Sequence, residues 1–65
     1  MKNYIAYCSN GRSFGFCSNY RANSKKNKED ASKQFVFIYR HHPPHIERTE
    51  LSREDDSTFL ATHRY

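Results

Sequence analysis

The stretch from Ser24 to Pro44 constrains the fold most, because it combines a helix start, a helix-spaced apolar run and a firm stop. Serine and asparagine often cap a helix by accepting a hydrogen bond from its first turn. Ser24 and Asn27 can both do so. Asn27 is favoured, since Glu29 and Asp30 would then lie in the first turn, near the positive end of the helix dipole.

The predicted helix covers about residues 28–42 and ends before the proline pair, because proline disfavours helical geometry in its predecessor and cannot extend the hydrogen-bond ladder. Its buried face would carry Ala31, Phe35, Ile38 and His42. The run 35–39 is also typical of a buried strand, and that alternative stays open. If the run is helical, Val36 and Phe37 lie off the central stripe and either widen the buried face or remain as an exposed patch, and an exposed pair of this kind would indicate an interaction site.

Residues 2–21 are predicted to form a β-hairpin, because Asn10-Gly11 is a strong turn signal between two aromatic-rich runs. A two-residue turn there and a four-residue loop over residues 11–14 both divide the side chains between the sheet faces in the same way. The core face would hold Ile5, Tyr7, Phe14, Phe16 and Tyr20. The other face would hold Tyr4, Ala6, Cys8, Gly15 and Cys17, with Gly15 indicating a bulge or a close approach by another backbone.

The remaining segments complete one domain over residues 1–65. The polar, basic stretch 19–28 is a connection, about residues 45–51 form a short strand with Ile46 opposite Thr49, and residues 58–64 are a possible last strand. We therefore expect an α+β fold of order ββαβ(β), in which a small antiparallel sheet carries one helix on one face.

The composition limits the size of the core. Only 11 of the 65 residues are strong core formers, and a chain this short buries about 60% of its unfolded surface. A homodimer, or a partner that completes the core, is therefore a reasonable expectation. No signal peptide or membrane span is evident, and two cysteines do not make a disulfide scaffold, so we expect a cytoplasmic protein with reduced thiols and no membrane association.

Charge is divided unevenly along the chain. Residues 1–28 carry six basic residues and no acid, whereas residues 29–65 carry seven acids and five bases. An asymmetry of this kind determines which partners a surface attracts. The N-terminal half should attract an anionic surface, either an acidic protein patch or nucleic acid.

Enzymatic patterns are absent from the sequence, which contains no nucleophile motif, no glycine-rich phosphate loop and no paired carboxylates in an apolar setting. We therefore expect a protein that is not an enzyme and binds no cofactor. Zinc is an outside alternative, because thiolate and imidazole are its preferred ligands. The candidate ligands are Cys8, Cys17, His41 and His45, although eight residues separate the cysteines and no Cys-x-x-Cys knuckle exists.

The expected function is binding through a basic, aromatic-rich surface. Tyrosine and arginine are enriched at protein-interface hot spots, while basic side chains also contact phosphates and aromatic rings stack on bases. The expected contact residues are Tyr4, Arg12, Tyr20, Arg21, Lys25, Lys26, Lys28, Phe37 and Arg40.

The first hypothesis is an inhibitor or adaptor that docks on an acidic or nucleic-acid-handling protein. The alternatives are a direct RNA- or DNA-binding module and, third, a zinc-stabilised module. In size and composition the chain resembles small phage-encoded inhibitors, anti-CRISPR proteins among them, but no residue motif matches one.

Overall fold

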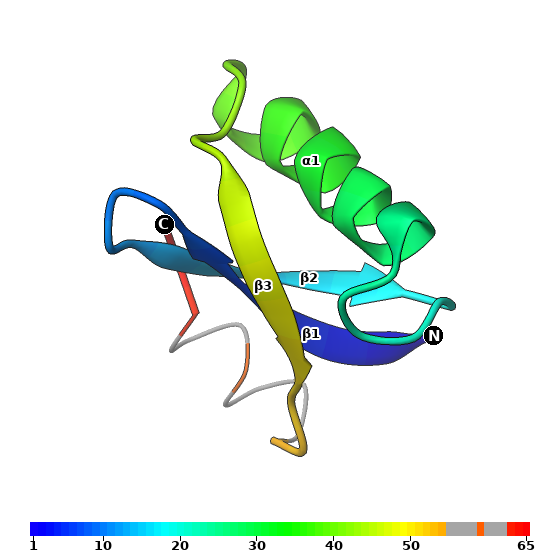
Figure 1. Ribbon diagram of the computed structural model, residues 1–65. Helices are drawn as coiled ribbons and strands as arrows, with labels where there is room; N and C mark the ends of the chain where they lie inside the picture. The colour runs from blue at the N-terminus through cyan, green and yellow to red at the C-terminus, as the bar shows by residue number, and fades with distance from the viewer. Residues whose placement is uncertain (55–58, 60–62) are drawn as a thin grey trace.

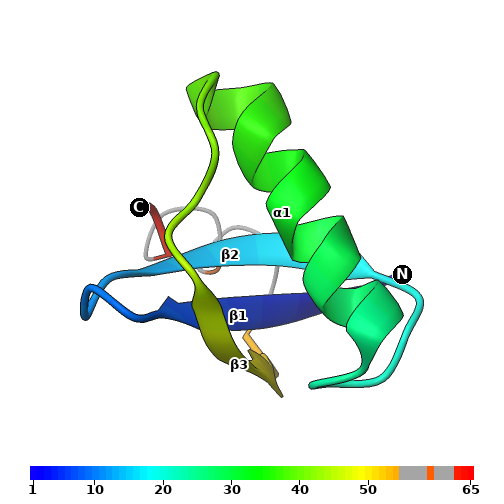
Figure 2. The ribbon, with the colours of Figure 1, turned by 45° about the horizontal axis from the view of Figure 1, so that its top comes forward.

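The computed structural model describes residues 1–54, 59 and 63–65, and its elements follow the order ββαβ. They are β1 (Lys2–Cys8), β2 (Ser13–Ser18), α1 (Lys25–Tyr39) and β3 (Ile46–Leu51). The strands form one antiparallel sheet with β1 in the centre, between β2 and β3, and α1 lies across one face of it (Figures 1 and 2). The predicted α+β fold is confirmed, whereas the possible last strand over residues 58–64 lies largely outside the described residues.

The hairpin turn between β1 and β2 has three residues, Ser9 to Gly11, enclosed by the backbone-bonded pair Cys8 and Arg12. The N–H of Gly11 donates to the Cys8 carbonyl (3.1 Å), and the N–H of Cys8 donates to the Arg12 carbonyl (2.8 Å). Gly11 has a φ of +86°, as expected for a three-residue hairpin loop whose last residue is left-handed. The predictions of a two-residue turn and of a four-residue loop are therefore both wrong.

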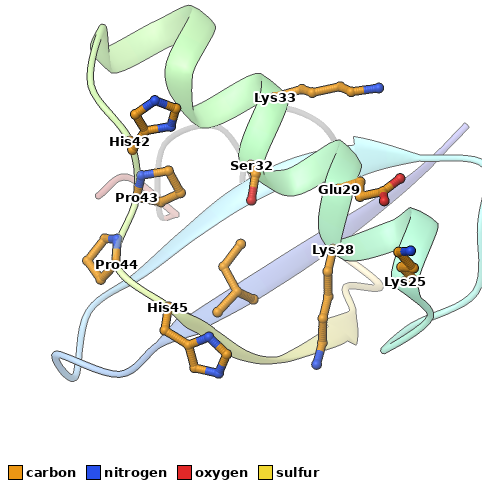
Figure 3. A pocket seen from close by; sticks show the side chains of 10 residues that line it. Lys25, Lys28, Glu29, Ser32, Lys33, His42, Pro43, Pro44 and His45 are labelled. Carbon is orange, nitrogen blue, oxygen red and sulfur yellow. The ribbon is translucent and has the colours of Figure 1, made fainter.

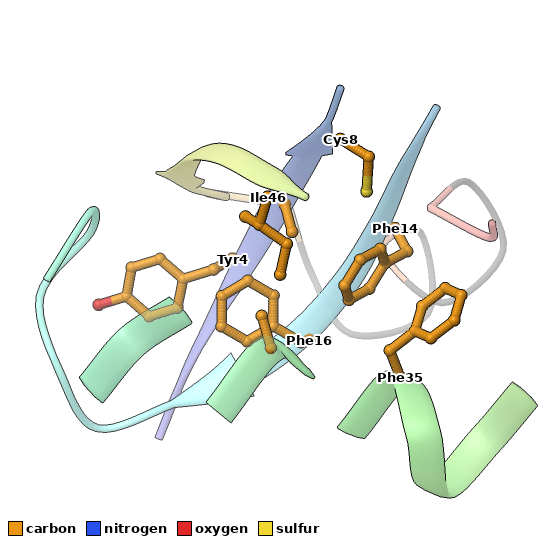
Figure 4. Packing of buried hydrophobic residues seen from close by; sticks show 8 residues of the cluster. Tyr4, Cys8, Phe14, Phe16, Phe35 and Ile46 are labelled. Atoms are coloured by element: carbon orange, nitrogen blue, oxygen red, sulfur yellow. The ribbon is translucent and has the colours of Figure 1, made fainter. Parts of the chain in front are cut away.

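The odd loop length changes which side chains of the two strands share a face. Tyr4 lies opposite Phe16, and Ala6 lies opposite Phe14. The prediction that Phe14 and Phe16 face the core is confirmed, but the assignment for β1 is inverted, because Ile5 and Tyr7 turn away from the helix and are only half-buried. The core under α1 consists of Tyr4, Ala6, Cys8, Phe14, Phe16, Ala31, Phe35 and Ile46 (Figure 4). Tyr20, also predicted there, is exposed.

Helix α1 begins earlier than predicted, because Ser24 caps it. The Ser24 hydroxyl accepts a hydrogen bond from the N–H of Asn27 (3.2 Å), and the backbone of Ser24 is extended. The helix stops at Tyr39, where Arg40 adopts a left-handed conformation with a φ of +65° and donates its N–H to the Val36 carbonyl. The run 35–39 is thus helical, and the predicted limits of about 28 and 42 are both too late.

A buried polar network joins the start of α1 to β3. Asn27 donates to the Tyr20 carbonyl (3.0 Å), and the Thr49 hydroxyl donates to Asn27 Oδ1 (2.6 Å). Asn23 donates its N–H to Thr49 Oγ1 (2.8 Å) and accepts the N–H of Thr49 on its side-chain oxygen (2.7 Å). Among the described residues, no buried side-chain nitrogen or oxygen lacks a partner. The stretch predicted as a simple connection therefore fixes where α1 and β3 meet.

Strand β3 contains an irregularity that brings Ile46 and Thr49 to the same buried side, although they are three residues apart. Cys8 pairs with Ile46, whereas its neighbour Tyr7 pairs with Arg48, so Glu47 is an extra residue in β3. Bulges of this kind bend a strand and reset its side-chain alternation. The prediction that Ile46 and Thr49 face opposite sides is wrong for this reason.

The end of the chain packs on the sheet face opposite α1. Phe59 is buried, and a Cβ added at Gly15 would lie 2.5 Å from a carbon of its ring. The N–H of Gly15 donates to the His63 carbonyl (3.0 Å). The predicted close approach at Gly15 is confirmed. Tyr65 then reaches the helix side, with its ring edge against Phe35 at a centroid distance of 4.8 Å.

Candidate functional site

The predicted contact residues lie in separate places. Tyr4 is 4% exposed, so the prediction that it is a surface residue is wrong. Arg12 lies in the hairpin region, with its guanidinium 4.9 Å from the centroid of the Tyr65 ring. The other seven predicted residues gather at the two ends of α1, five of them in or just before its first turn and two at its far end.

The outer face of α1, which we define as Lys26, Lys33 and Phe37, points away from the sheet. These residues are seven and four positions apart, a spacing that places them on one side of a helix. All three are exposed, and Phe37 is 74% exposed. The guanidinium of Arg40 lies 5.7 Å from the centroid of the Phe37 ring. The outer face therefore combines free positive charge with an uncovered aromatic ring.

Ile38 adds to this apolar surface, since it is 59% exposed. The sequence placed Ile38 on the buried stripe, but the residues that face the sheet are Asn27, Ala31 and Phe35, and half-buried Tyr39 continues their four-residue interval. With that interval the residue after Phe35 in the buried stripe is Tyr39, so Ile38 lies outside the stripe. The sequence left open whether Val36 and Phe37 are buried, and in the structure Phe37 is exposed and Val36 is half-buried.

Positive charge is concentrated at the start of α1. Lys25, Lys26 and Lys28 follow the cap, and the first turn contains no acid. Cations are unfavourable at the positive end of the helix dipole, so this arrangement opposes helix stability and concentrates positive potential. The ion pairs within the described residues join Arg48 to Glu50 and His63 to Glu54, so no described acid neutralises these lysines.

An exposed aromatic ring lies beside this cluster. Tyr20 is 43% exposed, and Lys26 Nζ lies 5.2 Å from the centroid of its ring. Arg21 is exposed and lines a small cavity of about 300 Å³ together with Lys2 at the start of β1. The predicted grouping of Tyr20 and Arg21 with the helix-start lysines is therefore present on the surface.

A groove of about 600 Å³ runs between α1 and residues 42–46 (Figure 3). Lys25 and Lys28 line it from the helix, and Pro43 and Pro44 line it from the extended segment. Lys28 Nζ also donates to the Glu47 carbonyl (3.3 Å). Sequence patterns did not reveal this groove, because it forms only when the segment after the helix folds back beside it.

The zinc alternative finds little support in the arrangement of its candidate ligands. Cys8 lies in the core under α1, whereas half-buried Cys17 points to the other face and donates its thiol to Asn3 Oδ1. The prediction that the two thiols share a face is therefore wrong. Burial raises the pKa of the Cys8 thiol, and the nearby charge of Glu47 raises this pKa further. No three potential ligands converge within the described part of the chain.

In comparisons with known proteins, no family model, curated protein or solved structure matches this chain. Within the residues that the structure describes, no helix has the length and apolar character needed to cross a membrane. Functional assignment therefore depends on the chemistry of the surface, above all on α1.

Proposed function

We propose that this chain is a small non-enzymatic cytoplasmic binding protein, an inhibitor or adaptor, that docks the outer face of α1 on an acidic surface of a partner protein. The observation that carries the proposal is the exposure of Phe37, 74%, on a helix whose exposed lysines have no acidic partner among the described residues. Aromatic anchors with basic neighbours are typical of the residues that dominate binding energy at protein interfaces.

The apolar component favours a protein over nucleic acid as the partner. Phe37 and Ile38 are adjacent in sequence, and both are more than half exposed. Burying such side chains contributes about 1.5–3 kcal/mol each, but only against a partner that offers an apolar pocket. Acidic protein surfaces can combine such a pocket with carboxylates for Lys26 and Lys33. A protein that handles nucleic acid qualifies as such a partner where it exposes an acidic patch, since the positive outer face of α1 would be repelled by the basic groove that holds the polyanion.

Side chains of the protein already bond backbone groups at both sheet edges, which favours docking through side chains over the addition of a strand. On β2, the Gln34 side chain accepts the N–H of Cys17 (2.9 Å) and donates to the Cys17 carbonyl. On β3, Asn23 accepts the N–H of Thr49, and Lys28 donates to the Glu47 carbonyl. These contacts occupy backbone groups that an added strand would need. A partner therefore has better access to α1 than to either edge.

Affinity capture from nuclease-treated lysate of the source cell tests the proposal. The wild-type chain should retain a specific protein, and Phe37→Ser should reduce its capture at least several-fold, because the variant removes an exposed ring without disturbing the core. Leu51→Ser is the matched control, since Leu51 is also an exposed apolar residue, 43%, but lies on β3. The proposal is wrong if no protein survives nuclease treatment, or if both variants capture the partner equally well.

Direct nucleic-acid binding is a second candidate, favoured by one observation. Tyr20 is exposed beside Lys26 and Arg21, an arrangement that can stack a base while contacting phosphates. Retention on random single-stranded nucleic acid should then fall steeply with salt and depend on Tyr20. A chain that ignores nucleic acid at low salt eliminates this candidate.

A further inference from the structure

The groove beside α1 has two chemically different walls. Figure 3 shows Lys28 and Ser32 directed from the helix toward the space in front of residues 42–46. Pro43 and Pro44 form the opposite wall. Proline has no backbone N–H, so this wall offers apolar contact without donors from those two residues. The helix supplies the lysine and Ser32 donors, and the imidazole rings of His42 and His45 add donors on the opposite wall.

The charge of the groove selects for anions. Lys25, Lys28 and Lys33 line it together with a single acid, Glu29, among the described residues. None of the three lysines forms an ion pair with a described residue. Desolvating three cations beside one carboxylate is costly unless the ligand supplies negative charge. The complement of this wall is a ligand that carries carboxylate or phosphate groups.

The shape of the groove and its lining favour a peptide as that ligand. A volume of about 600 Å³ is within the usual range for a ligand site. The aromatic rings among the described lining residues are the imidazoles of His42 and His45, and no Phe or Tyr is present, so the groove offers smaller stacking surfaces than sites built from Phe or Tyr. Successive side chains of an extended peptide point to opposite sides. Alternating acidic and apolar residues would therefore meet the lysine wall and the proline wall at the same time.

We propose that this groove binds an extended peptide segment in which acidic and apolar residues alternate. Lys25 and Lys28 contact its carboxylates, and Pro43 and Pro44 contact its apolar side chains. The identification of this segment as part of the partner protein rests on the proposed function, but binding of the peptide itself does not require the partner.

Fluorescence anisotropy at an ionic strength of about 0.15 M, where the Debye length is about 8 Å, tests the groove with a short labelled peptide of alternating Glu and Val. The comparison probes are a peptide of the same composition with Glu and Val in separate blocks, a peptide with Gln in place of Glu, and a single-stranded oligonucleotide of equal charge. The alternating peptide should bind several-fold more tightly than each of the other three. The double variant Lys25→Gln, Lys28→Gln should weaken binding about threefold to tenfold, the range expected for two exposed ion pairs.

The control is the double variant Lys2→Gln, Arg53→Gln, which removes the same charge outside both the groove and the outer face of α1. It should change binding by about twofold or less, since distant charges are screened. Circular dichroism checks that both variants fold. The inference is wrong if the two double variants weaken binding equally, if the block peptide binds as well as the alternating one, or if the oligonucleotide binds more tightly and displaces the peptide.

The two proposals fail separately. If the peptide binds as expected but Phe37→Ser captures the partner as well as wild type does, the groove stands and the outer face of α1 is not the docking surface. If the peptide does not bind but capture still depends on Phe37, the outer face stands and the groove inference is wrong.

Discussion

The hydroxyl group of Thr49 holds two segments of the chain at once. It donates to Asn27 Oδ1 and accepts the N–H of Asn23, and the Thr49 side chain is fully buried. Removing one member of such a network leaves the others buried without a partner, which costs about 1–3 kcal/mol. A substitution that keeps the shape of the side chain does not compensate for that loss. The position of α1 over the sheet thus depends on hydrogen bonds as well as on aromatic packing.

We predict that Thr49→Val, which keeps the shape of the side chain, lowers the free energy of unfolding by about 1–3 kcal/mol. Thr49→Ser keeps the hydroxyl and removes one methyl group, so its loss should be smaller, about 1 kcal/mol. Urea unfolding of both variants measures the difference. A Val variant as stable as the Ser variant would show that packing, and not the hydrogen bonds, holds this site.

At the scale of elements, Gln34 gives α1 a second role besides covering the core. Its side-chain amide bonds both the N–H and the C=O of Cys17, as a neighbouring strand would. Open strand edges promote association between chains, and proteins commonly cover them. The helix therefore packs on the sheet and also protects its β2 edge.

We predict that Gln34→Glu at pH 7 lowers the free energy of unfolding by about 1–3 kcal/mol, because the carboxylate can accept from Cys17 N–H but cannot donate to the Cys17 carbonyl. Below about pH 4 the introduced carboxyl is protonated and can donate again. The difference from wild type should then shrink. Urea unfolding at both pH values measures it, with Gln34→Ala as a control that lacks both groups. A pH-independent difference would contradict the role assigned to the donor.

The sequence predicted the elements better than the relations between them. Asn10-Gly11 correctly indicated a hairpin, but the number of loop residues decides which side chains of β1 face the core, and the dipeptide is compatible with two, three or four. Ser24 and Asn27 are both good caps, and the choice between them depended on Thr49, which lies 22 residues beyond Asn27 and makes that asparagine a buried partner. Local patterns carry no information about such distant contacts.

At the scale of the whole molecule, the candidate site shows the same division. The lysines at the helix start and the apolar run 35–39, which is longer than one helix face can bury, were visible in the sequence. The hypothesis of an interaction site in this run depended on an exposed residue, and Phe37 is exposed. The burial of Tyr4 follows from the hairpin loop, and the groove follows from the return of residues 42–46 beside α1. Both are consequences of tertiary packing. The residue types of the site were therefore predictable, and its shape was not.

Charge distribution couples stability to binding across the molecule, because lysines in the first turn of α1 oppose the helix dipole. We predict that Lys25→Glu raises the free energy of unfolding by about 0.3–1 kcal/mol through this dipole. The new carboxylate would repel Glu29 and attract Lys28, at intervals of four and three residues, and these two effects nearly cancel. The same change removes positive charge from the groove, so binding to the acidic peptide should weaken.

Urea unfolding and peptide anisotropy on the same preparation measure the two effects of Lys25→Glu, which should have opposite signs. Lys2→Glu is the control, because it makes the same change in net charge on β1, outside α1 itself and outside the lining of the groove. It should leave stability within about 0.5 kcal/mol of wild type, as is usual for a surface substitution. If Lys25→Glu instead destabilises the fold, Lys25 stabilises it, and the claim that the lysines at the helix start reduce stability is wrong.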